Sequence, residues 1–119
     1  MKISEHFNRE EFTCSCGCEF NTVDAELLRV LEQVRTHYDQ PVTINSACRC
    51  LEHNRAIGST DTSQHVNGKA ADIKIKSVSS IGIYHYLNNL YPDCFGIGIY
   101  DSFLHIDVRD DKGRWDNRT

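Results

Sequence analysis

Three side chains in the second half of the chain have the types and spacing of ligands for a divalent metal ion. His65 leaves a turn-rich stretch, Asp72 lies in the alternating segment 70–75, and His105 lies in FLHIDVR (103–109). Two imidazoles and one carboxylate form a three-ligand set for zinc that leaves a fourth position for water. Because an open position distinguishes catalytic from structural zinc sites, a zinc ion held by this set would be of the catalytic kind.

Side-chain alternation along strands favours the convergence of these residues. In FLHIDVR, His105 and Asp107 share one face, while the apolar residues between them face the core. In AADIKI, which spans 70–75, Asp72 lies on the polar face and Ile73 on the core face. Two such polar faces can meet across paired strands. The alternative for any one of these histidines or aspartates is a solvated or hydrogen-bonded residue without a ligand.

The elements that must position these residues follow from hydrophobic periodicity and turn residues. We expect helices at 23–38, 51–57 and 78–90, and strands at 42–44, 70–75, 96–100 and 103–109, with a tight turn at Asp101-Ser102 joining the last two. Asn21 or Thr22 is expected to cap the first helix. The tail, 110–119, is expected to be a surface segment that Trp115 pins. Helices separated from clustered antiparallel strands predict an α+β fold.

Composition limits the domain organisation and the classes of partner. The chain has 119 residues, of which 39% are hydrophobic and 25% charged, and its net charge is −4. This length predicts a single domain over 1–119, with a cysteine-containing lead at 1–20 and a motif-bearing core at 42–109. There is no basic run, so we expect no nucleic-acid partner. No apolar run approaches the roughly 18 residues of a membrane span. A monomer is expected.

Six cysteines are a high number for a chain of this length. They are Cys14, Cys16, Cys18, Cys48, Cys50 and Cys94. The start, MKISEHFNREEF, is not typical of a secretory signal, so a disulfide framework is disfavoured in the reducing cytosol. Two interpretations stay open. The cysteines at 14–18 could bind a second, structural zinc with one of the later three, or the thiols only pack and form disulfides after release from the cell.

Three motifs, in order along the chain, resemble the zinc D-Ala-D-Ala carboxypeptidase family of metallopeptidases, peptidase M15. They are S-x-x-R at 46–49, S-x-H-x-x-G-x-A-x-D at 63–72, and G-x-G-x-Y followed by F-x-H-x-D over 96–107. Asn54 followed by Gly58 resembles a further element, and the similarity covers 42–109. The lead HFNREEFTCSCGC is similar to that of small members from bacteriophages and prophages.

The resemblance implies a zinc ion held by His65, Asp72 and His105. It also implies an α+β fold like that of hedgehog and DD-peptidase domains, with a small antiparallel sheet that carries the metal and packs against two or three helices. Arg49 looks like the family arginine that binds a substrate carboxylate or stabilises the tetrahedral intermediate, a role that suits a guanidinium.

The activity that the resemblance implies is cleavage of peptide bonds in peptidoglycan stem peptides. The chain would act as a D-Ala-D-Ala carboxypeptidase or as an endolysin-type endopeptidase. The alternative is a non-catalytic, zinc-containing module of the same fold that binds the cell wall. On this interpretation the chain is made in the cytoplasm without a signal peptide. It would reach the cell wall or periplasm after release or by virion delivery.

The general base is the position at which the chain departs from the family pattern. Several branches place a glutamate three residues before the last histidine ligand, where this chain has Ser102. Asp101 is the nearest carboxylate and is therefore the expected base. Asp107 is the other catalytic candidate, because from the ligand face it could orient His105 or Arg109.

Overall fold

In the described part of the chain, five strands form one sheet in the order β1-β2-β4-β3-β5. They are β1 (Thr43–Ser46), β2 (Ala70–Lys74), β3 (Gly96–Ile99), β4 (Leu104–Asp107) and β5 (Gly113–Asp116). Neighbouring strands are antiparallel except for β3 and β5, which are parallel. The structure is a computed structural model that describes residues 2–14, 16, 23–59 and 63–119.

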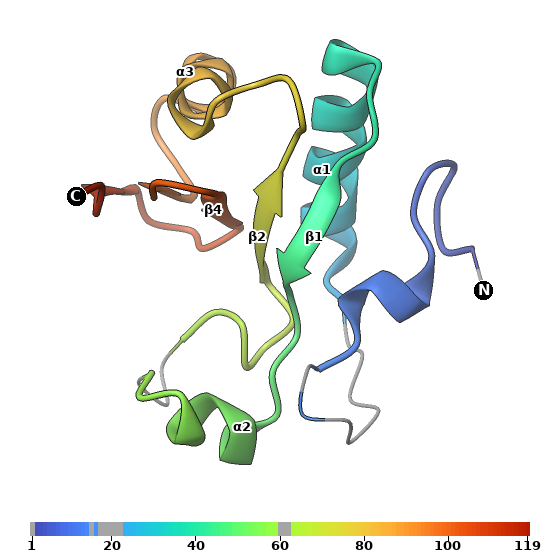
Figure 1. Cartoon of the computed structure of the whole chain (residues 1–119), viewed down its shortest axis with the longest axis vertical. Helices are drawn as coiled ribbons and strands as arrows, with labels where there is room; N and C mark the ends of the chain where they lie inside the picture. Colours follow the sequence, from blue (N-terminus) through green and yellow to red (C-terminus); the bar gives the residue numbers. More distant parts are fainter. Residues whose placement is uncertain (1, 15, 17–22, 60–62) are drawn as a thin grey trace.

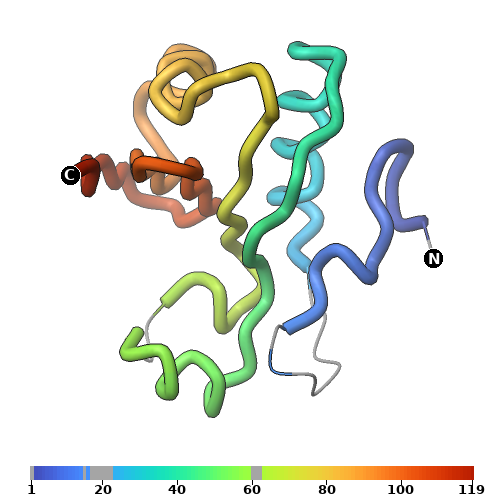
Figure 2. Tube along the Cα trace, in the orientation of Figure 1, coloured from blue at the N-terminus to red at the C-terminus, as the bar shows by residue number. Residues whose placement is uncertain are grey.

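Helices and the sheet together confirm the expected α+β class. The helices are η1 (Arg9–Phe12, a 3-10 helix), α1 (Ala25–Tyr38), α2 (Leu51–Ala56) and α3 (Ser80–Leu90). Figure 1 shows α2 beyond the end of β1, apart from α1 and α3. The two chain ends lie on opposite sides of the molecule, as the trace in Figure 2 shows. No helix in the described ranges combines the length and the apolar character that a membrane span requires.

The first helix begins later than its periodicity predicts. Its N-cap is Asp24, whose carboxylate accepts the backbone N–H groups of Glu26 and Leu27. The caps expected at Asn21 or Thr22 fall outside the described residues, and the structure gives this position to Asp24 instead. A carboxylate suits an N-cap because it satisfies free N–H groups and interacts favourably with the helix dipole.

One apolar core joins α1, α3, the sheet and the N-terminal lead. Phe7 and Phe12 of the lead are fully buried in it, with ring centroids 6.1 Å apart. Burial of such a side chain contributes about 1.5–3 kcal/mol. The lead is also held by Glu32 of α1, which accepts hydrogen bonds from the Ser4 hydroxyl and the His6 backbone N–H. The part of the lead that the structure describes, residues 2–14, therefore belongs to the folded domain.

The C-terminal tail differs from the surface segment that we expected. It forms β5, which pairs with β3 so that Trp115 lies opposite Gly98. Arg114 secures the strand by donating hydrogen bonds to the backbone carbonyls of Tyr91 and Phe95. A four-residue strand has too short a pattern to be recognised in sequence, and these contacts come from distant residues.

Candidate metal centre

The sheet register brings two of the three expected ligands together. In the antiparallel pairing of β2 and β4, Asp72 lies directly opposite His105. Side chains of directly opposed residues lie on the same face of a sheet. The polar faces of the two strands therefore meet, as side-chain alternation predicted.

His65 reaches this face from the loop between α2 and β2. Its backbone N–H donates to the Ser63 hydroxyl at 3.3 Å, and Gly68 turns the chain back with a φ of +68°. That left-handed conformation favours glycine, since a Cβ atom would be strained there. The His65 imidazole is buried and lies next to that of His105, with ring centroids 5.2 Å apart.

The distances between the ligand atoms fit one zinc ion. His65 Nε2 lies 3.4 Å from Asp72 Oδ1, and His105 Nδ1 lies 3.0 Å from the same oxygen. Zinc bonds of about 2.0–2.2 Å in a tetrahedron separate neighbouring ligands by about 3.3–3.6 Å. The observed separations are close to these values. The donor set and its spacing therefore suit zinc without rearrangement of the backbone.

Each imidazole is oriented by a partner on its second nitrogen. His65 Nδ1 donates to the carbonyl oxygen of Ala47 at 2.6 Å, and His105 Nε2 donates to Asp107 Oδ2 at 2.7 Å. These hydrogen bonds fix the tautomers and leave His65 Nε2 and His105 Nδ1 to bind a metal. Such partners are typical of histidine ligands and raise their basicity.

Asp107 is fully buried and joins His105 to Arg109. Its carboxylate accepts from Nε and Nη2 of Arg109, both at 2.7 Å, and from the backbone N–H of Gly96 at 3.1 Å. Burial alone would raise the pKa of Asp107, but the hydrogen bonds from His105 and Arg109 hold that pKa well below its usual value. Asp107 is therefore an ionised acceptor that positions the histidine.

Two glycines of β3 make room for the groups around this centre. A Cβ atom on Gly96 would overlap the Asp107 carboxylate, and one on Gly98 would overlap the indole of Trp115. The indole lies 5.1 Å from the His105 ring, and the Arg109 guanidinium lies over it. The position of Trp115 between His105 and Arg109 was not predicted from the sequence. The G-x-G spacing was the available signal, since paired glycines mark close approach.

An open cavity of about 700 Å³ lies over the three ligands. Besides them it is lined by Arg49, Tyr100, Phe103, Arg109 and Trp115, among others. Tyr100 accepts a hydrogen bond from Trp115 Nε1 and stacks on Phe103. The cavity thus has two guanidinium groups and an aromatic wall beside the candidate metal position.

Arg49 is buried, and its donors are only partly used. Nη1 donates to Asn54 Oδ1 at 3.0 Å, Nη2 lies 4.0 Å from Asp72 Oδ2, and Nε has no hydrogen-bond partner. Burial lowers the pKa of Arg49, although Asp72 opposes this shift. Burying a donor without an acceptor is costly. This arrangement suits a side chain that receives an anionic group from a ligand.

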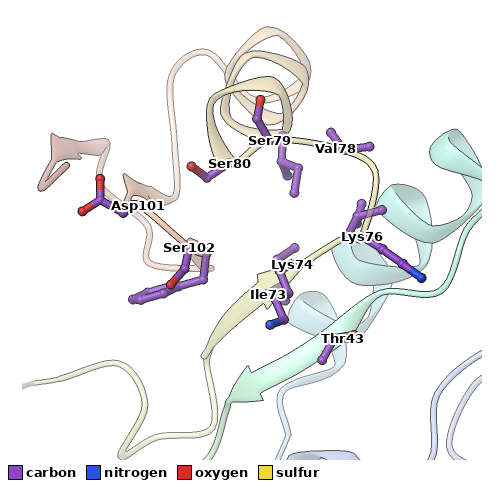
Figure 3. A pocket seen from close by; sticks show the side chains of 12 residues that line it. Thr43, Ile73, Lys74, Lys76, Val78, Ser79, Ser80, Asp101 and Ser102 are labelled. Atoms are coloured by element: carbon purple, nitrogen blue, oxygen red, sulfur yellow. The ribbon is translucent and has the colours of Figure 1, made fainter. Parts of the chain in front are cut away.

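Asp101 and Ser102 are not brought to this cavity. They line a second cavity of about 500 Å³, between β2 and the start of α3 (Figure 3). Asp101 is exposed and accepts hydrogen bonds from the backbone N–H and the hydroxyl of Thr119. The turn directs Asp101 toward the C-terminus, while its neighbours Tyr100 and Phe103 line the metal cavity. The geometry thus gives no support to Asp101 as the general base.

Comparison with known families identifies the chain. A family model described as Peptidase M15 matches residues 5–107. The chain belongs to the Peptidase M15 family. This membership confirms the resemblance found in the motifs and implies zinc peptidase activity in general terms. None of the curated proteins compared with the chain is significantly similar to it. In this M15 chain the His65, Asp72 and His105 group is the candidate zinc centre.

Proposed function

We propose that this M15 chain is a zinc peptidase that cleaves peptide bonds close to free carboxylates in peptidoglycan stem peptides. The observation that carries the proposal is Arg49, a buried guanidinium with an unfilled donor, beside a three-ligand zinc centre. A planar guanidinium binds carboxylates through two parallel hydrogen bonds. Stem peptides carry several carboxylates, so they present a group that Arg49 could bind.

The residues around the candidate centre have separate roles: some would bind the metal ion, and others would bind or orient the substrate. His65 and His105 present the nitrogens that their partners leave available, and Asp72 lies between them. A zinc ion bound there would supply Lewis-acid polarisation of a carbonyl and a more acidic water. Arg49 is placed to hold a substrate carboxylate, and Trp115 offers an apolar wall that excludes water from one side.

A second candidate function is favoured by the lack of an obvious proton acceptor. Among the described residues that line the cavity, Asp72 supplies the only carboxylate, and it is engaged with both histidines. Since Asp101 faces a different cavity, a module that binds cell-wall peptides without cleaving them also fits this site. In that case Arg49 would bind the carboxylate and no hydrolysis would follow.

The place of action belongs to the same proposal. Peptidoglycan lies outside the cytoplasmic membrane, so we propose that the chain acts at the cell wall, in the manner of an endolysin. The order of the motifs and the lead, which is similar to that of small phage members, supports this role. An open cavity accommodates the end of a peptide as well as an internal peptide bond. The experiment below therefore tests for both carboxypeptidase and endopeptidase activity.

Digestion of isolated peptidoglycan tests the proposal. Muropeptides are analysed by mass spectrometry after incubation with zinc-loaded protein, with and without chelator. We expect zinc-dependent release of D-Ala or of stem fragments, lost in His65→Ala and at least about 10-fold slower in Arg49→Lys, which loses the planar fork. Asp116→Asn, on the exposed surface, is the matched control. Zinc-dependent binding without any new product would establish the binding module, and neither binding nor cleavage would reject both.

A further inference from the structure

Three cysteine sulfurs meet at a second position in the fold. Cys14 and Cys16 lie in the N-terminal lead, and Cys50 is the N-cap of α2. Their Sγ atoms are separated by 3.5 Å (Cys14 and Cys16), 3.9 Å (Cys14 and Cys50) and 3.6 Å (Cys16 and Cys50). A disulfide would need about 2.05 Å. Zinc–sulfur bonds of about 2.3 Å in a tetrahedron place sulfurs about 3.8 Å apart. The triangle therefore has the size of a zinc-thiolate site.

Backbone N–H groups point at two of these sulfurs. The N–H of Cys50 donates to Cys14 Sγ at 3.4 Å, and the N–H of His53 donates to Cys50 Sγ at 3.3 Å. Hydrogen bonds to a charged group favour its charged form. Cysteine binds a metal as the thiolate, and these two N–H groups are directed at sulfurs that would carry its charge.

We propose that Cys14, Cys16 and Cys50 bind a second zinc ion through three thiolates, separate from the centre formed by His65, Asp72 and His105. None of the three cysteines lines the cavity over that centre. Soft thiolate ligands select zinc over magnesium or calcium. Of the three later cysteines that the sequence offered as partners of the cysteines at 14–18, Cys50 lies beside Cys14 and Cys16. Cys18 lies outside the described residues.

The position of this site gives the ion a mechanical role. Cys50 directly follows Arg49, whose backbone N–H donates to the His65 carbonyl at 3.0 Å. The carbonyl oxygen of Ala47, in the same segment, accepts a hydrogen bond from His65 Nδ1. A zinc ion on the cysteines ties the N-terminal lead to this segment, 47–50, and so steadies both His65 and Arg49. Metal ligation of this kind stabilises small domains that have a limited core.

Cobalt reconstitution of the reduced full chain separates the two sites. Cobalt bound by thiolates absorbs strongly in the near ultraviolet through sulfur-to-metal charge transfer, whereas a site of histidine and carboxylate lacks this band. Wild type is expected to bind about two cobalt ions and to show the band. His65→Ala should lose one ion and keep the band. Cys50→Ser should lose one ion and the band, and serine remains a good N-cap for α2. Cys94→Ser is the matched control and should keep both.

Binding of a single ion by reduced wild type, without the sulfur band, would overturn the proposal. Survival of the full band in both Cys14→Ser and Cys50→Ser would also overturn it. Should those variants fail to fold, thiol reactivity of wild type decides. Zinc loading should protect three thiols from a thiol reagent relative to the metal-free protein, and equal reactivity in both forms would contradict the site.

Discussion

Replacement of Asp107 by asparagine tests whether this buried carboxylate positions the metal ligand. Oδ2 accepts from His105 and from Nη2 of Arg109, and Oδ1 accepts from Nε of Arg109 and from the Gly96 N–H. An amide offers one oxygen and one NH₂ group. Either orientation therefore sets its N–H groups against existing donors, and one of the two sets loses its acceptor.

Two magnitudes follow from this geometry. Loss of the partner that orients a histidine ligand weakens metal affinity by about 10- to 100-fold, which is about 1.4–2.7 kcal/mol. Breaking a buried ion pair costs about 3–5 kcal/mol of folding stability. The Arg109 side chain is 35% exposed and regains water, so we expect the lower end, about 3 kcal/mol.

Zinc affinity of Asp107→Asn is measured by competition with a chromophoric chelator, and stability by urea denaturation of the metal-free protein. Asp116→Asn is the control, because its partner Arg118 is an exposed neighbour and the pair lies at the surface. It should change neither quantity. Wild-type zinc affinity in a folded Asp107→Asn protein would refute the positioning role, as would equal losses in the two variants.

Three further changes test other parts of the structure. Burial would raise the pKa of Glu32, but hydrogen bonds from Ser4 and His6 hold it below its usual value. Glu32→Gln should therefore cost about 1–2 kcal/mol at pH 7. The difference from wild type in urea denaturation should shrink in acid and vanish as the pH falls through the lowered pKa of Glu32. Gly98→Ala should displace Trp115, shift the emission maximum of its fluorescence and lower the zinc affinity. In Arg49→Lys, binding of a stem peptide by calorimetry should weaken while zinc affinity stays unchanged.

The matched controls for these changes also lie in the chain. Glu26→Gln removes an exposed pair with Arg29 and should be nearly neutral at every pH. A pH-independent loss in Glu32→Gln would contradict the role given to its charge. Gly82→Ala lies in helix α3, where the new Cβ atom would meet only Val78 and Ser79, so the fluorescence of Trp115 should not change there. Equal stem-peptide affinity in wild type and Arg49→Lys would remove Arg49 from the binding site.

The arrangement of Asp72 and His105 was predictable because it depends on the alternation of side chains along two strands. Alternation places His105 and Asp107 on one face of their strand and Asp72 on the polar face of its own strand. The observed pairing of β2 with β4 then places Asp72 opposite His105. Gly58 ends the short helix with a φ of +81°, as expected for a glycine after a helix. Strand alternation and a glycine that ends a helix both depend on the local backbone conformation, which residues close in sequence determine.

The features that sequence missed depend on contacts between distant residues. β5 is held in place by Arg114, which donates hydrogen bonds to the backbone carbonyls of Phe95 and Tyr91, 19 and 23 residues earlier in the chain. Asp101 does not line the cavity over the three candidate ligands, and its carboxylate accepts hydrogen bonds from Thr119 at the C-terminus. The cysteine site combines the lead with α2, and spacing alone named six candidates without choosing among them. Each outcome needed the tertiary arrangement of the chain.

A crystal structure of the zinc-loaded protein, with anomalous data at the zinc edge, tests the central claim most directly. The account predicts a peak about 2.0–2.2 Å from His65 Nε2, an Asp72 carboxylate oxygen and His105 Nδ1, on the floor of the cavity that Arg49 lines. A fully zinc-loaded crystal with no peak at this position, or with the ion held by other atoms, would contradict it.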